Sequence, residues 1–159
     1  MAENAKLQRS AALMRLMMAA VMISSMNATL FHVALPQISA EFQLTLAQTS
    51  WLSSAYTLIY AFGAATYGKL ADRFQLKTLL TFGIVLFAAG SLVGLASGSF
   101  AAALLGRCLQ SAGAAAMPAA ALIIPVRYFP PERRGSAIGM TAAGVALGSA
   151  LAPFITALI

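Results

Sequence analysis

Five long apolar stretches, separated by short polar segments, dominate the hydropathy pattern of this chain. They cover residues 16–35, 51–68, 78–97, 100–126 and 136–159. A helix needs about 20 mainly apolar residues to cross the hydrocarbon core of a bilayer, because no water is present there to satisfy backbone polar groups. The pattern predicts an all-α, polytopic membrane helix bundle, with five spans in a domain of residues 16–159 after an amino-terminal segment of residues 1–15.

The composition supports a membrane protein and disfavours several soluble classes. Of the 159 residues, 60% are hydrophobic and 9% are charged, whereas about a quarter of the residues in a soluble domain are charged. The formal net charge of +6 does not indicate nucleic-acid binding, because the charges lie in clusters between apolar stretches and form no basic stripe. One cysteine (Cys108), one histidine and four carboxylates predict no disulfide, metal site, cofactor or enzymatic activity.

The basic residues alternate between the connections and predict an orientation. Nine of the ten fall in the amino-terminal segment and in the second and fourth connections: Lys6, Arg9, Arg15, Lys69, Arg73, Lys77, Arg127, Arg133 and Arg134. The connections around residues 36–50 and 97–99 contain no lysine or arginine. Because cytoplasmic loops collect basic residues, we expect a multi-pass protein of the cell membrane, a bacterial inner membrane, with its amino terminus in the cytoplasm.

The sequences at the two ends of the chain each lead to a prediction. The first apolar stretch follows basic residues as a signal peptide does, but it is longer than the usual 7–15 residues and lacks a small-x-small cleavage site. We therefore expect it to be a retained membrane helix. The sequence ends at Ile159 within an apolar stretch that has no polar or aromatic flank, so we expect a truncated chain.

Polar residues inside the spans mark candidate functional faces. Arg107, Gln110 and Ser111 lie at helical i, i+3, i+4 spacing and share one face, which we expect to point into the bundle. An arginine within a membrane costs at least about 2.5 kcal/mol on insertion scales, which favours a functional role. The alternative is an arginine that snorkels to the outer interface. Tyr56 and Tyr60 form an aromatic stripe that suits a substrate path, with ordinary packing as the alternative.

Small residues recur at four-residue spacing on two spans and predict close helix contacts, because they let helix backbones approach in lipid. The third span carries Gly90, Gly94 and Gly98, and the fifth carries Gly144, Gly148, Ala152 and Thr156.

The connection between the second and third spans carries the most specific motif. It reads GKLADRFQLK from Gly68 to Lys77 and resembles the GxLaDRxGRKxxL signature of the major facilitator superfamily. The resemblance implies a cytoplasmic gate formed by Gly68, Asp72, Arg73 and Lys77. The chain departs from the signature at its second glycine and at the following arginine, where it has glutamine and leucine.

Three spans resemble further segments of the drug:proton antiporter branch of that superfamily. NATLFHVALPQI, which begins at Asn27, is similar to DxTIVNVALPxI, but Asn27 replaces the acidic residue and cannot carry a proton, and His32 replaces an asparagine. RCLQSAG, which begins at Arg107, is similar to RxxQGxG, with Ser111 in place of glycine. The fifth span resembles the motif that ends GPxxGG and retains only Pro153 of its last residues.

The resemblance implies that the chain forms part of the amino-terminal half of a major facilitator fold. It also implies that this half belongs to a proton-coupled efflux transporter for drugs or other small molecules. It places Arg107 in proton coupling. The candidate substrate path holds Asn27, Tyr56, Tyr60 and Gln110, and Gly144, Gly148 and Pro153 are expected to pack helices. The expected partners are the lipid bilayer and, once the remaining helices are present, a small-molecule substrate and protons. The alternative is a non-transporting membrane remnant or a small membrane interaction subunit.

Overall fold

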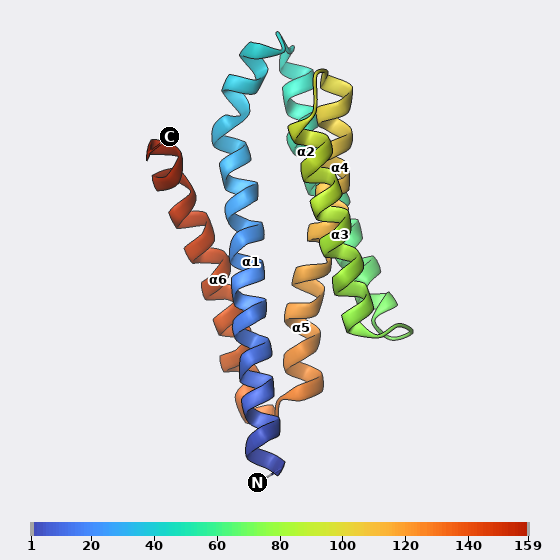
Figure 1. Cartoon of the computed structure of the whole chain (residues 1–159), viewed down its shortest axis with the longest axis vertical. Helices are drawn as coiled ribbons and strands as arrows, with labels where there is room; N and C mark the ends of the chain where they lie inside the picture. The colour runs from blue at the N-terminus through green and yellow to red at the C-terminus, as the bar shows by residue number, and fades with distance from the viewer. Residues whose placement is uncertain (1, 159) are drawn as a thin grey trace. The chain divides into compact units, whose positions relative to one another are not determined.

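The computed structural model describes residues 2–158, with side chains for residues 12–155. Within these residues every regular element is an α-helix (Figure 1), so the predicted all-α class is confirmed. The helices are α1 (Ala2–Glu41), α2 (Leu46–Leu70), α3 (Leu76–Leu95), α4 (Phe100–Ala114), α5 (Ala116–Tyr128) and α6 (Pro131–Leu158).

By length and composition, four described segments are able to cross a membrane: Ala12–Glu41, Leu76–Leu95, Phe100–Tyr128 and Pro131–Ile155. The predicted span 51–68 does form a helix, α2, but it is not among the four, because its serine, threonine and tyrosine residues lower its mean hydropathy.

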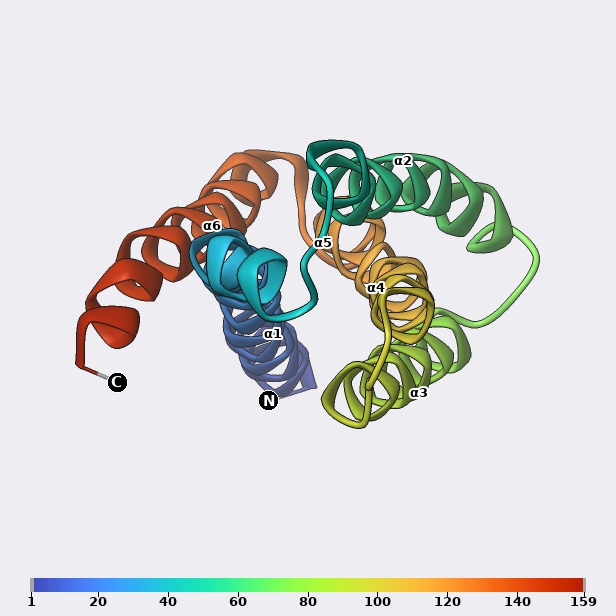
Figure 2. The same cartoon turned by 90° about the horizontal axis from the view of Figure 1, so that it is seen from above.

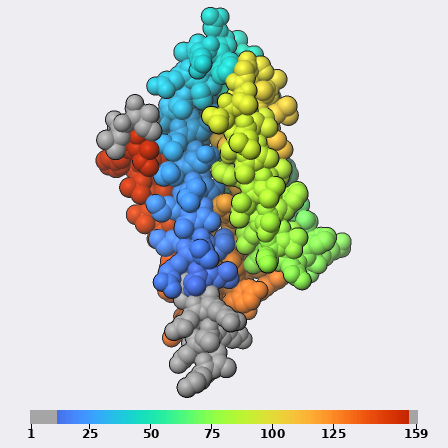
Figure 3. Space-filling view, viewed as in Figure 1, coloured from blue at the N-terminus to red at the C-terminus, as the bar shows by residue number. Residues whose placement is uncertain are grey.

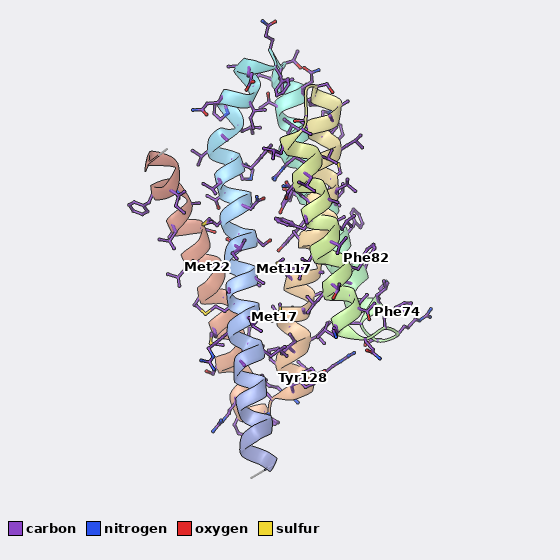
Figure 4. The ribbon with its side chains drawn as sticks, in the orientation of Figure 1. Met17, Met22, Phe74, Phe82, Met117 and Tyr128 are labelled. Carbon is purple, nitrogen blue, oxygen red and sulfur yellow. The ribbon has the colours of Figure 1, made fainter. Side chains whose placement is uncertain are left out.

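The outer face of α3 is apolar and open to its surroundings. Phe82 and Val85 are 59% and 61% exposed, and Phe82 lines an open apolar groove together with Phe62 and Tyr67 of α2 (Phe82 is labelled in Figure 4). The space-filling view shows one side of α3, in green to yellow-green, that no other described helix covers (Figure 3). An apolar surface of this kind is unfavourable in water and matches the hydrocarbon of a bilayer.

The predicted fourth span consists of two helices that meet at Ala115. The sequence explains the break, because Pro118 has no backbone N–H and cannot bond to the carbonyl of Ala114. Pro118 lies in the first turn of α5, where a missing donor is tolerated. The two helices together still form one apolar segment long enough for a single crossing.

The chain divides into two compact units, and each is described by itself. One unit is His32–Ala119, which holds α2, α3, α4 and the end of α1. The other joins Met1–Phe31 to Ala120–Ile159 and holds α6 with most of α1 and α5. Both boundaries fall inside helices, so no loop marks them in the sequence.

In the unit His32–Ala119, α4 lies between α2 and α3 (Figure 2). Glycines bring α3 and α4 into backbone contact: a Cβ added to Gly90 would lie 2.7 Å from the Gly106 carbonyl oxygen, and one added to Gly106 would lie 2.8 Å from the Gly94 nitrogen. A Cβ on Gly94 or Gly98 would meet no atom within 4 Å. Of the predicted stripe on the third span, Gly90 is therefore the position that has no room for a side chain.

The connection between α1 and α2 is fixed by local hydrogen bonds. Gln43 has a φ of 49°, the left-handed conformation that glycine usually supplies at a helix end. Thr45 caps α2 in a capping box, in which its hydroxyl accepts from the Gln48 backbone and the Gln48 side chain accepts from the Thr45 backbone. The hydroxyls of Ser39 and Thr49 lie 2.9 Å apart and join the two helices.

In the other unit, α6 lies beside α1 (Figures 1 and 2). A Cβ on Gly144 would lie 2.8 Å from the Met18 carbonyl oxygen, so this contact is again made by backbone. The Ser25 hydroxyl donates to the Val145 carbonyl over 2.9 Å and lies 2.7 Å from the Ser149 hydroxyl. Small residues and serine hydroxyls, the groups that join helices in lipid, therefore hold α1 and α6 together.

Candidate functional site

The polar face of α4 is buried, as the helical spacing predicts. Arg107, Gln110 and Ser111 are 4%, 9% and 0% exposed. Their burial follows from the position of α4 between α2 and α3, since a residue on either flank of α4 meets a neighbouring helix. A buried arginine needs compensating contacts.

The guanidinium of Arg107 rests on an aromatic ring from α2. Its Cζ atom lies 4.1 Å from the centroid of the Tyr56 ring, a distance typical of a cation–π interaction. Its Nη1 atom donates a hydrogen bond of 2.9 Å to Oε1 of Gln110, one turn further along α4. The charge therefore faces protein groups of α2 and α4, which is the opposite of the extended side chain that snorkelling requires.

Gln110 extends this contact to α3. Its Nε2 atom donates to the Ser91 hydroxyl oxygen over 2.8 Å, and the Ser91 hydroxyl donates to the Phe87 carbonyl over 2.9 Å. Ser91 was not among the residues indicated by the sequence. A lone serine in an apolar helix has no spacing that singles it out, so only the packing of α3 on α4 reveals its role.

Two further contacts fix the Tyr56 side of the site. The Ser111 hydroxyl donates to the Tyr56 backbone carbonyl, which ties α4 to α2. The rings of Tyr56 and Tyr60 stack with their centroids 6.1 Å apart and 15° between their planes. The structure therefore brings together five of the residues indicated by the sequence: Arg107, Gln110, Ser111, Tyr56 and Tyr60.

This arrangement holds a positive charge in a region of low polarity. The electron-rich face of the Tyr56 ring and the Gln110 carbonyl oxygen both lie against the guanidinium, and both stabilise its charge. Such a site can attract an anionic or electron-rich group and can repel a proton or a cation.

The residues expected at the gate lie around the turn between α2 and α3. Asp72 and Arg73 are exposed in this turn, and Lys77 is exposed at the start of α3. The side chain of Phe74, between them, points away from the helices (Figure 4). A Cβ on Gly68 would meet nothing within 4 Å, so the described part of the chain supplies no close helix contact at this glycine.

The remaining predicted residues belong to the unit of α1 and α6. Asn27 lies on α1, and its side-chain oxygen is buried without a hydrogen-bond partner among residues 12–155. Gly144 and Gly148 lie on α6 against the backbone of α1. Pro153 lies inside α6, where its missing N–H leaves the Ser149 carbonyl without the usual helical bond.

The described side chains, residues 12–155, form no group of three or more histidine, cysteine, aspartate or glutamate residues that is able to hold a metal ion. The candidate site therefore rests on Arg107 and its aromatic, amide and hydroxyl neighbours.

Residues 17–159 match the family model described as Major Facilitator Superfamily. The chain is 31% identical over 139 residues to the riboflavin transporter RibZ of Clostridioides difficile (strain 630), which covers 87% of this chain and 30% of the relative. It is 33% identical over 139 residues to the tetracenomycin C resistance and export protein of Streptomyces glaucescens, covering 87% and 26%. It is 36% identical over 136 residues to the efflux pump dotC of Dothistroma septosporum, covering 86% and 23%. The chain thus spans less than a third of the length of these relatives.

The solved structures of a bacterial homolog to the human lysosomal transporter Spinster have a similar fold. The inward-facing, unoccupied structure matches with a TM-score of 0.77 at 23% identity, over 90% of this chain and 30% of that one. The inward-facing, occupied structure matches with a TM-score of 0.76 at 24% identity, over 89% and 31%. At this identity the likeness concerns the fold alone.

Proposed function

Because this chain belongs to the major facilitator superfamily of membrane transporters, we propose that it is the amino-terminal part of a proton-coupled efflux transporter for drugs or other small molecules. The observation that carries the proposal is the buried guanidinium of Arg107, held on the Tyr56 ring inside the helices. Burying a charge among membrane helices costs free energy, and helices that only pack against one another do not require a buried charge.

The names of two relatives support the direction of transport. One is an efflux pump and another is a resistance and export protein, whereas a third is a riboflavin transporter. We propose that the substrate path of this chain includes Asn27, Tyr56, Tyr60 and Gln110. The stacked tyrosines suit substrates with aromatic groups, because aromatic rings pack favourably against one another.

Arg107 acts on proton coupling through its charge and not as a proton carrier. A guanidinium stays protonated in proteins, so it cannot release a proton during a transport cycle. It lowers the affinity of a nearby site for a proton or a cation. In this proposal Asn27 is not the proton carrier, because its side chain is an amide.

Arg107→Ala and Arg107→Lys in the complete reading frame test this role. Export from energised cells is expected to be lost in Arg107→Ala, and Arg107→Lys is expected to restore little of it, because a lysine ammonium lacks the planar fork that contacts Gln110 and Tyr56 together. The amount of protein in the membrane is measured in parallel. Unchanged export in Arg107→Ala would refute the coupling role.

We also propose that the amino terminus and the gate residues Gly68, Asp72, Arg73 and Lys77 lie on the cytoplasmic side of a bacterial inner membrane. The positive charges of the α2–α3 turn support this orientation. The exposed residues Gln43 and Gln75, on opposite predicted sides, provide a matched test. In a Cys108→Ser background, an impermeant thiol reagent is expected to label Gln43→Cys in intact cells and Gln75→Cys only after permeabilisation. The reverse labelling would overturn the orientation.

The alternative function is a non-transporting membrane protein, either a remnant or a small interaction subunit. The observations that favour it are Asn27 in place of the acidic residue of the first-span motif and the missing glycines around Pro153. Further hydrophobic helices in the same reading frame would support the transporter. A stable 159-residue product that moves no substrate and lacks such helices would support the alternative.

A further inference from the structure

Ser91, on α3, contacts neither Tyr56 nor Arg107 directly in the network described above, yet it completes that network. We propose that Ser91 is a positioning residue: it fixes the orientation of the Gln110 amide, and through that amide it holds the Arg107 guanidinium on the Tyr56 ring. Any effect of Ser91 on transport rests on the proposed function. The effect of Ser91 on the position of the Arg107 guanidinium does not, and it is measurable without a substrate.

The hydrogen bonds run in one direction, from α4 to α3. Arg107 Nη1 donates to Gln110 Oε1 over 2.9 Å, and Gln110 Nε2 donates to the Ser91 oxygen over 2.8 Å. The Ser91 hydroxyl proton is engaged with the Phe87 carbonyl over 2.9 Å. The Ser91 oxygen therefore faces Gln110 as an acceptor.

This direction explains why Ser91 decides how the amide is turned. If the amide rotated by 180°, its NH₂ group would face the Arg107 guanidinium, which has only donors. Its oxygen would then face the Ser91 oxygen, which could donate to it only by giving up the hydrogen bond to the Phe87 carbonyl. The rotated amide would therefore lose the bond to Arg107 and keep a bond to Ser91 only at the expense of another, at a buried position where unpaired polar groups are costly. In Ser91→Ala one of these two constraints disappears, and the amide is held by Arg107 alone.

Gly90 is the reason that Ser91 reaches Gln110. A Cβ on Gly90 would lie 2.7 Å from the Gly106 carbonyl oxygen and 2.9 Å from the Leu109 carbonyl carbon. The backbones of α3 and α4 are therefore in contact next to Ser91. A short serine side chain spans the remaining gap to the Gln110 side chain of α4.

The test measures how firmly the Arg107 guanidinium is held. The protein, including any residues that flank this chain in its reading frame, is labelled with ¹⁵N-arginine for NMR. The N–H signals of Arg107 are identified because they disappear in Arg107→Lys. Ser91→Ala is expected to speed hydrogen exchange of these N–H groups about threefold to tenfold, the effect of losing one neutral hydrogen bond. Ser91→Thr keeps a hydroxyl that bonds the carbonyl four residues back and is expected to exchange like the wild type.

Two controls separate positioning from a general loosening of helices. Ser50→Ala removes a hydroxyl with the same kind of intrahelical bond, 2.9 Å to the Leu46 carbonyl, at an exposed position of α2, and is expected to leave exchange unchanged. In a Gln110→Ala background, Ser91→Ala is expected to add nothing, because the link between the two residues is already broken. Wild-type exchange in Ser91→Ala, or an undiminished effect of Ser91→Ala without Gln110, would overturn the proposal.

Export measured on the same variants links the positioning to transport. Ser91→Ala is expected to lower the export rate at unchanged protein level, and Ser91→Thr to restore it. If Arg107→Ala leaves export intact, the proposed function fails. The hydrogen-exchange rates of the Ser91 and Gln110 variants still decide the role of Ser91. If Arg107→Ala abolishes export while Ser91→Ala leaves exchange unchanged, the proposed function stands and the positioning role fails.

Discussion

Replacing Gly90 with alanine tests the backbone contact on which the Arg107 site depends. The added methyl group would lie 2.7 Å from the Gly106 carbonyl oxygen and 2.9 Å from the Leu109 carbonyl carbon. Ordinary contact for a Cβ begins at 3.4 Å, so the helices would have to separate by at least about 0.7 Å, because the Gln110 backbone nitrogen would lie closer still. All three neighbours are backbone of α4 and cannot move aside as a side chain can.

The expected effect is a loss of about 1–3 kcal/mol in the free energy of unfolding, the usual result of adding a methyl group to a closely packed site. The intrinsic helix preference of alanine over glycine, about 1 kcal/mol, acts in the opposite direction. The steric term should win because the contact is between two backbones, and the separation also lengthens the hydrogen bond from Gln110 to Ser91.

Titration of the detergent-solubilised chain with SDS, followed by circular dichroism, measures this free energy. Gly94→Ala is the matched control: it lies one turn along the same helix, and its added methyl group would meet no atom within 4 Å. We expect Gly94→Ala to be neutral or slightly stabilising. If Gly90→Ala unfolds at the same SDS fraction as the wild type, or if Gly94→Ala is equally destabilising, the reasoning from close backbone contact is wrong.

Two further substitutions test contacts at other places in the fold. Ser25→Ala removes the hydrogen bonds to the Val145 carbonyl and the Ser149 hydroxyl and is expected to destabilise the chain by about 0.6–2 kcal/mol in the SDS titration, as for other hydrogen bonds between membrane helices. Thr45→Ala removes the hydroxyl that accepts from the Gln48 backbone and is expected to cost about 0.5–2 kcal/mol, seen as faster amide hydrogen exchange in the first turn of α2.

Each of these substitutions has its own control. Thr57→Ala removes an intrahelical bond to the Ser53 carbonyl on an exposed face of α2 and should change stability by less than Ser25→Ala. Thr45→Ser keeps a capping hydroxyl and should keep slow exchange. Equal effects of Thr57→Ala and Ser25→Ala would argue against a specific bond between α1 and α6, and fast exchange in Thr45→Ser would argue against capping.

The buried site was only partly accessible from the sequence. Helical spacing placed Arg107, Gln110 and Ser111 on one face, because that relation is set by the geometry of a single helix. The partners from other helices were not accessible in the same way. Tyr56 was indicated only as part of an aromatic stripe, and Ser91 was not indicated, since contacts between helices depend on how closely and in which register they pack.

The sequence by itself determined the all-α membrane class and the family. These properties depend on local chain length, apolar composition and a motif of adjacent residues, each of which is readable along one dimension. Only the tertiary structure decided which glycine of the stripe Gly90, Gly94 and Gly98 has no room for a side chain, where the fourth span breaks and which serine completes the arginine site. Those features arise from distances between segments far apart in the chain, and hydropathy carries no information about such distances.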